Sequence, residues 1–168
     1  MDVAELRRLQ APLKQKYRDD AAAARIPARA EAVLDPGAIA ARVTGEHRSM
    51  AGLHPAAGGD GAMACSADML LEALVACAGV TLCAVAMSMG VALRGGRVIA
   101  EGVWDARGTL GVDKAAPVGL TEIALRFELD TDADQAARER LIALTERYCV
   151  IFQTLRSPPR LSVMPASG

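Results

Sequence analysis

The sequence lacks the features that mark several classes of protein. It has 168 residues and a formal net charge of -1. Because charges of both signs are interspersed along the chain, there is no basic patch for nucleic acid and no acidic tail. The N-terminus lacks the apolar core and the small-residue cleavage site of a secretory signal. We therefore expect a cytoplasmic protein that does not bind nucleic acid.

Cysteine is also scarce, and its four copies follow no metal-binding pattern. No Cys-x-x-Cys pair or Cys/His cluster has the spacing of a structural zinc site, and four cysteines in a chain of this length do not form a disulfide scaffold. The glycine-rich run at 58–61 lacks the phosphate-loop and dinucleotide patterns, so we interpret it as a flexible lid or hinge. We predict no metal and no cofactor, and any disulfide would be transient and functional.

Hydrophobic periodicity predicts one globular domain of the α+β class with mostly antiparallel strands. Residues 1–25 form an N-terminal helical extension, and residues 26–168 form the main domain. Pro36 and Gly37 favour a turn between the first two strands. The expected order is a helix at 2–24, strands at 29–34, 38–44 and 50–53, a helix at 68–89, strands at 97–107 and 122–129, a helix at 133–148 and an edge strand at 161–164.

The predicted helix at 133–148 is amphipathic. Thr131 or Asp132 is placed to cap its first turn. Cys149 follows directly at its C-terminal end. Its inner face carries Ala137, Leu141, Leu144 and Tyr148.

The segment 68–89 is almost wholly apolar, interrupted by Glu72, Thr81 and Ser88. This composition predicts a helix that is buried on nearly all sides. A transmembrane span needs about 20 apolar residues, but the many alanines and glycines, Glu72 in the second turn and the amphipathic flanking sequence argue against a membrane. Because a helix that is apolar all round needs cover on both sides, we expect a second subunit to cover it in a homodimer.

Two cysteines, Cys77 and Cys149, lie near the inner faces of predicted helices 72 positions apart. Taken alone, Cys77 is more often a small core residue than a nucleophile. Cys149 lies where an amphipathic helix ends, beside Arg147 and Tyr148, and is expected to be partly accessible. Peroxide reduction requires a thiolate that attacks the O–O bond and a second thiol that condenses with the resulting sulfenic acid. The pair can do this only if the fold brings the two thiols together.

Two stretches of the sequence resemble motifs of one known family. Residues 66–82, SADMLLEALVACAGVTL, resemble the central helix of the osmotically inducible protein C (OsmC) and organic hydroperoxide resistance family. Residues 146–155, ERYCVIFQTL, resemble its second cysteine motif, and the order of elements matches from about residue 29 to residue 164. The resemblance implies an OsmC-like fold, in which antiparallel sheets wrap around a buried central helix in an intertwined homodimer.

The same resemblance implies thiol-dependent reduction of hydroperoxides, especially organic ones. Cys77 would be the peroxidatic thiolate and Cys149 the resolving thiol. Asp68 occupies the place of an acidic residue that the family presents just before the central helix. Its implied role is to orient a cation that lowers the thiol pKa and polarises the peroxide.

Three features depart from the family's pattern, and one of them is Glu72, described below. The family's activating arginine lies near the turn of the N-terminal hairpin, where this chain has the sequence DPG at 35–37. Arg42 or Arg29 on the flanking strands would have to replace it. Proline often follows the second cysteine in the family, whereas Val150 stands here.

The remaining reactive side chains have simpler structural interpretations. Cys83 lies about 120° from Cys77 around the helix, so the two do not share a face, and Cys83 is expected to pack in the core. Cys65 precedes the helix and is expected in a loop, as is His54. Glu72 is a buried-looking carboxylate near Cys77, which disfavours a thiolate unless the carboxylate is paired.

We therefore predict an OsmC-like thiol peroxidase that reduces an organic hydroperoxide and is recycled by an external dithiol reductant. An alternative keeps the same fold as a non-catalytic module that binds a small apolar ligand at the dimer interface. In that case the cysteines are packing residues. The lack of an arginine in the hairpin turn keeps this alternative open.

Overall fold

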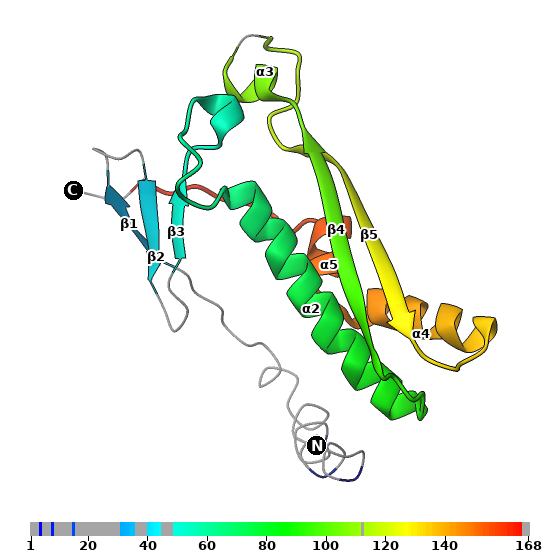
Figure 1. Ribbon diagram of the computed structural model, residues 1–168. Helices are drawn as coiled ribbons and strands as arrows, with labels where there is room; N and C mark the ends of the chain where they lie inside the picture. The colour runs from blue at the N-terminus through cyan, green and yellow to red at the C-terminus, as the bar shows by residue number, and fades with distance from the viewer. Residues whose placement is uncertain are drawn as a thin grey trace. The chain divides into compact units, whose positions relative to one another are not determined.

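The computed structural model describes residues 4, 8, 15, 31–35, 40–44, 49–111 and 113–165, and at 31–35, 40–44 and 49 it describes the backbone alone (Figure 1). The chain divides into two compact units. Unit 1 consists of Met1–Leu70 and Gly102–Ile123, and unit 2 consists of Leu71–Glu101 and Ala124–Gly168. The predicted N-terminal helix falls outside the described residues except at three helical positions, and the predicted domain boundary, Arg29 and the turn at 36–37 lie wholly outside them.

Unit 1 contains a three-stranded antiparallel sheet near the N-terminus. Its strands are β1 (Glu31–Asp35), β2 (Ala40–Thr44) and β3 (Ser49–Gly52), in the order β1-β2-β3. At the middle of β2, Arg42 is the backbone partner of Val33 on β1 and of Met50 on β3. The predicted hairpin and the short third strand are therefore confirmed.

The central helix α2 runs over Ser66–Met89. Alanine and leucine favour the helical backbone along its length, and the helix ends where Gly90 adopts a φ of 70°. By length and composition α2 would also pass as a membrane span, with a mean hydropathy of 2.2, a test that core helices of soluble proteins also pass. The helix predicted at 68–89 is confirmed.

Within the single chain, one face of α2 is buried and the opposite face is open. The opposite face includes Val80, whose side chain is 73% exposed. The expectation of a helix buried on nearly all sides therefore does not hold for the single chain, because its described strands and helices cover one face only. The buried residues follow a four-residue spacing: Leu74, Ala78, Leu82 and Ala86.

Two long strands, β4 (Gly95–Trp104) and β5 (Leu120–Asp130), pair in a second sheet and lie side by side in Figure 1. Gly96 has a φ of 151°, and a Cβ there would lie 2.4 Å from the carbonyl oxygen of Glu128 on the paired strand. Glycine is thus required for the close approach of the two backbones. The strand predicted at 97–107 ends earlier, because Asp105 caps the short helix α3 (Ala106–Thr109) by accepting a hydrogen bond from the Arg107 amide at 2.9 Å.

Unit 2 ends with two consecutive helices, α4 (Gln135–Tyr148) and α5 (Val150–Arg156). Asp134, rather than Thr131 or Asp132, caps α4, accepting a hydrogen bond from the Ala137 amide at 2.7 Å. Tyr148 is exposed, whereas Leu141 and Thr145 are fully buried. The prediction that Tyr148 lies on the inner face is therefore wrong, because the buried side of the chain continues from Leu141 and Thr145, at a four-residue spacing, to Cys149.

The core of unit 2 forms where α2, the β4–β5 sheet and the last two helices meet. One cluster centres on Leu74, Ala78 and Cys149, and the other on Leu82, Ala86 and Leu141. Val98 and Phe127 pack against both clusters. Residues 158–165 form no strand and are exposed. The edge strand predicted at 161–164 is therefore absent from the single chain, where no described strand pairs with it.

Candidate functional site

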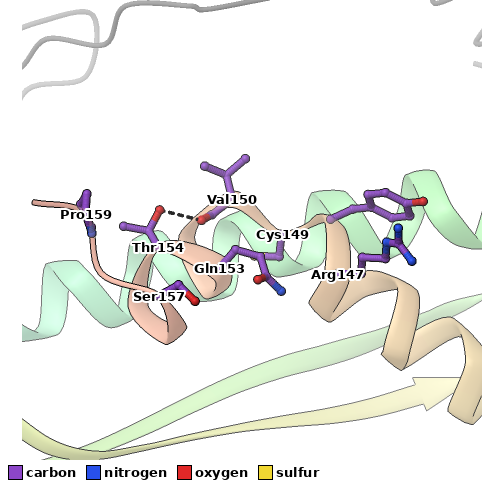
Figure 2. Close-up of a pocket in the computed structure, with 8 residues that line it drawn as sticks. Arg147, Cys149, Val150, Gln153, Thr154, Ser157 and Pro159 are labelled. Atoms are coloured by element: carbon purple, nitrogen blue, oxygen red, sulfur yellow. Dashed lines mark hydrogen bonds between the residues drawn. The ribbon is translucent and has the colours of Figure 1, made fainter.

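The fold brings together the two cysteines that the sequence separates by 72 positions. Cys77 lies in the middle of α2, and Cys149 lies between α4 and α5 (Figure 2). Both side chains lie in one core cluster, and both thiols are free. Cys77 is half-buried and Cys149 is fully buried, so the expectation of a partly accessible Cys149 is wrong. The thiol pair is thus formed by the core packing of unit 2 itself.

The backbone around Cys149 explains why its sulfur is held in place. Its amide donates to the carbonyl of Thr145 at 2.9 Å, which completes the last turn of α4. The backbone then becomes extended at Cys149, with φ -74° and ψ 110°. The Sγ accepts a hydrogen bond from the Phe152 amide at 3.5 Å, so the cysteine is also the N-cap of α5. Cys149 therefore closes one helix with its backbone and begins the next with its side chain.

The surroundings of Cys77 favour the thiolate. Burial by itself raises the pKa of Cys77, but hydrogen bonds from the Ile151 amide, the Cys149 thiol, the Val150 amide and the Thr81 hydroxyl outweigh it. The net effect is to lower the pKa of Cys77 below its usual range. Since a thiolate is the reactive form of cysteine, Cys77 has the properties of a nucleophile.

The pKa of Cys149 is shifted in the opposite direction, above its usual range. Burial raises the pKa of Cys149, and the hydrogen bond to Cys77 and the negative charge of the Cys77 thiolate raise it further. Hydrogen bonds from the amides of Phe152 and Ile151 lower the pKa of Cys149, but the effects that raise it are larger. Of the two thiols, Cys77 is therefore the one that loses its proton first as the pH rises.

Three donors around Cys77 were missed by the sequence-based predictions. They are the hydroxyl of Thr81 and the amides of Val150 and Ile151. Thr81 lies four residues after Cys77, the spacing at which side chains on a helix are neighbours, and this signal was available in the sequence. The two amides carry no sequence signal, because their position depends on where α5 begins.

A family model for OsmC-like proteins matches residues 59–164, which include both cysteines and the elements that carry them. The chain belongs to the OsmC-like protein family. The fold of this OsmC-like protein agrees with the match, because α2, the β4–β5 sheet and the α4–α5 pair all lie within the matched residues. The OsmC-like fold predicted from the two motifs is therefore confirmed.

Solved structures share the fold of this OsmC-like protein at low sequence identity. An OsmC-like protein from Mycoplasma pneumoniae matches with a TM-score of 0.67 and 18% identity, over 80% of this chain and 90% of that one. An organic hydroperoxide resistance protein OsmC from Legionella pneumophila matches with a TM-score of 0.62 and 18% identity, over 79% of this chain and 93% of that one. An organic hydroperoxide resistance protein from Elizabethkingia anophelis matches with a TM-score of 0.63 and 16% identity, over 80% of this chain and 92% of that one. A comparison with curated protein sequences gave no match.

The two other predicted site residues of this OsmC-like protein belong to unit 1, whereas the thiol pair belongs to unit 2. Asp68 lies exposed in the first turn of α2, where a carboxylate interacts favourably with the helix dipole. Arg42 lies in the middle of β2, and its backbone is described. The roles of Asp68 and Arg42 beside Cys77 therefore stay predictions.

The other reactive side chains take the following positions. Cys83 is exposed on α2, so the expectation that it packs in the core is wrong for the single chain. Glu72 is also exposed and is not the buried carboxylate that was expected. His54 caps a single 3-10 turn, η2 (Pro55–Ala57), by accepting the Ala56 amide on Nδ1 at 3.0 Å. Its ring meets Trp104 edge-on, with a centroid distance of 5.3 Å, so His54 has the loop role expected of it.

The described part of the chain contains no cluster of side chains suited to binding a metal ion. No group of three or more histidine, cysteine, aspartate or glutamate side chains there is arranged to hold a metal ion. The chemistry that these residues offer is that of the thiol pair.

Proposed function

We propose that this OsmC-like protein is a thiol peroxidase that reduces organic hydroperoxides through Cys77 and Cys149. One observation carries the proposal: the fold places the free thiols of Cys77 and Cys149 in one core cluster of unit 2, where their surroundings shift their pKa values in opposite directions. A pair used only for packing has no need of such an asymmetry. Perturbed pKa values of this kind mark functional sites.

In the first step, the Cys77 thiolate attacks one oxygen of the hydroperoxide. The S–O bond forms as the O–O bond breaks, and the alkoxide leaves and takes up a proton to become the alcohol. Cys77 is then a sulfenic acid, oxidised by two electrons, and the peroxide is reduced by two. The lowered pKa of Cys77 increases the fraction of Cys77 that is thiolate and so favours this attack.

In the second step, the Cys149 sulfur attacks the sulfenic acid, the disulfide forms and water leaves. The order of events follows from the cause of each pKa shift. Burial keeps the pKa of Cys149 high, and the charge on Cys77 adds to it as long as Cys77 is a thiolate. Oxidation of Cys77 removes that charge, so the pKa of Cys149 falls and its sulfur becomes a nucleophile after the peroxide has reacted.

The surroundings of the thiol pair favour an organic peroxide over hydrogen peroxide. Apolar side chains of four elements surround the pair, and such a lining interacts favourably with an alkyl or aryl group. The residues that pack there include Leu74, Val98, Leu125, Phe152 and Leu155.

The proposal is tested by counting thiols after a single addition of peroxide. When the reduced protein is mixed with one equivalent of cumene hydroperoxide, two of its four thiols should be lost, with one equivalent of cumyl alcohol formed. Peptide mapping should find the new disulfide between Cys77 and Cys149. Retention of all four thiols, or a disulfide that joins other cysteines, would refute the proposed function.

We also propose that a second copy of the chain covers the open face of α2. An apolar helix face that includes Val80, at 73% exposure, is not stable in water without cover. The particle measured by sedimentation should then have about twice the 17.5 kDa mass of one chain. A particle with the mass of a single chain at micromolar concentration would exclude this arrangement.

A further inference from the structure

The segment between β3 and α2 is a compact loop, residues 53–63. Its two ends meet at the Gly52 amide, which donates to the carbonyl of Ala64 at 3.0 Å. Within the loop the chain comes so close to itself that a Cβ on Gly59 would lie 1.6 Å from the carbonyl oxygen of Leu53. The loop is therefore closed at its base and tightly packed inside.

His54 accepts three backbone amides of this loop. Its carbonyl oxygen accepts the Ala57 amide at 2.8 Å and the Gly59 amide at 3.1 Å. Its ring nitrogen Nδ1 accepts the Ala56 amide at 3.0 Å. The ring contact differs from the other two because the imidazole can change its charge, whereas a carbonyl oxygen cannot. It is therefore the contact in this loop that responds to pH.

The His54 ring also attaches the loop to the end of β4. It meets the indole of Trp104 edge-on, with a centroid distance of 5.3 Å and an interplanar angle of 89°. The turn η2 packs against α3, which follows β4 in the chain (Figure 1). These elements all lie in unit 1. A movement of the His54 ring therefore changes the surroundings of Trp104, the single tryptophan of the chain.

Protonation of the His54 ring removes its contact with the Ala56 amide. Nδ1 accepts this amide through its lone pair, whereas in the imidazolium both ring nitrogens carry hydrogen and only donate. The N–H of Ala56 then faces another N–H. Histidine changes its charge within about pH 5 to 8, so acidification through this range breaks the contact while the carboxylates stay ionised.

No carboxylate compensates for the proton. Among the described residues, His54 forms no ion pair. Asp60, on the loop itself, accepts the Ala62 amide at 2.9 Å, and Asp105 and Arg107 at α3 pair with each other at 2.5 Å. Acidification thus removes a contact from the closed loop without adding a carboxylate partner. The other charged groups described on β4 and directly after α3 form no hydrogen bond or ion pair with the ring either: Arg97, Glu101, Asp113 and Lys114.

We propose that His54 is a pH-sensitive switch in the loop 53–63. With a neutral imidazole the loop is closed against Trp104, and with a protonated imidazole it opens. Only two residues lie between the loop and α2, so opening loosens the chain that leads into the helix carrying Cys77. The inference is independent of the proposed function, because neither thiol of the pair takes part in it.

Quenching of Trp104 emission by acrylamide tests the inference. Acrylamide is neutral, so its access to the indole reports exposure and not charge. When the pH is lowered from about 8 to about 5.5, the quenching constant of the natural protein should rise about twofold as the loop opens. The far-UV circular dichroism should stay constant, because the helices remain folded.

Hydrogen exchange of the loop amides gives a second measurement that does not depend on the ring contact with Trp104. After correction for the intrinsic effect of pH, peptides that cover 53–63 should exchange faster in the natural protein at the lower pH. His54→Asn should remove this pH dependence, since an asparagine side-chain oxygen accepts an N-cap amide and does not titrate.

The other histidine of the chain supplies the matched control. His47 lies outside the described residues, and His47→Gln should keep both responses of the natural protein. A pH-dependent exchange that His54→Asn retains, or that His47→Gln loses, would overturn the assignment. The same holds for quenching and exchange that do not change with pH in the natural protein, or that change only together with a loss of the helical signal.

Discussion

Replacement of Cys77 with serine should slow the consumption of cumene hydroperoxide by about three orders of magnitude or more. The serine hydroxyl stays protonated where the Cys77 thiol ionises, and the hydrogen bonds that lower the pKa of Cys77 cannot make an alkoxide of it at neutral pH. The measurement is the rate of peroxide loss with dithiothreitol as the reductant. A Cys77→Ser variant as fast as the natural protein would end the peroxidase proposal.

Two further serine variants assign the roles of the cysteines. Cys83→Ser changes an exposed thiol on the same helix and should leave the rate within about twofold, which controls for the substitution itself. Cys149→Ser should keep the first reaction with peroxide but accumulate the sulfenic acid, because no second thiol condenses with it. A trapping reagent such as dimedone should therefore label Cys149→Ser strongly and the natural protein weakly. If dimedone instead labels Cys149 in the Cys77→Ser variant, then Cys149 is the cysteine that attacks the peroxide and Cys77 is the resolving cysteine.

Val150→Pro should slow the attack on peroxide about tenfold below neutral pH. The substitution removes one N–H that donates to Cys77, and a hydrogen bond to a charged group is worth about 1.5–3 kcal/mol. The fold should tolerate it, because Val150 is the first residue of α5, where proline is favoured. Cys149 before it is already extended, as a residue before proline must be. The side chain of Val150 is 68% exposed, so its loss costs little packing.

The pH profile identifies the cause of this effect. In the natural protein the pKa of Cys77 lies below its usual range, so the reaction rate falls only when the pH drops through that lowered value. Loss of the Val150 amide raises the pKa of Cys77, so the fall begins at a higher pH, and the difference between the proteins should shrink as the pH rises. Val150→Ala keeps the amide and should follow the natural profile. Equal slowing by proline and alanine, or a difference independent of pH, would contradict the assigned role of the amide.

The sequence predicted the parts of the site that depend on side-chain periodicity. The apolar segment around Cys77 and the amphipathic segment before Cys149 each have a clear helical pattern, and the structure contains both helices. Thr131 or Asp132 is the predicted cap because the helix is expected to begin at residue 133. Asp134 caps α4 instead, because Thr131 is buried and its hydroxyl donates to the carbonyl of Ala92.

Other features depend on contacts that no local pattern encodes. The helix α5 was not predicted, since residues 150–155 are largely apolar and β-branched. It begins where the Cys149 sulfur accepts the Phe152 amide, a contact that no local pattern of side chains indicates. The strand expected at 161–164 has alternating residues but no described partner in the chain. A strand requires a second backbone to pair with, and a sequence pattern does not identify where that backbone comes from.

The donors that surround the two sulfurs have a consequence for how this protein tolerates mutation. Val150, Ile151 and Phe152 act on the thiols through their amides, and every residue except proline supplies the same N–H. Substitutions at these three positions, proline excepted, therefore keep the backbone N–H donors of the site as long as α5 still begins at Cys149. A change of side chain at these positions therefore alters the local sequence motif without removing an N–H donor from the site.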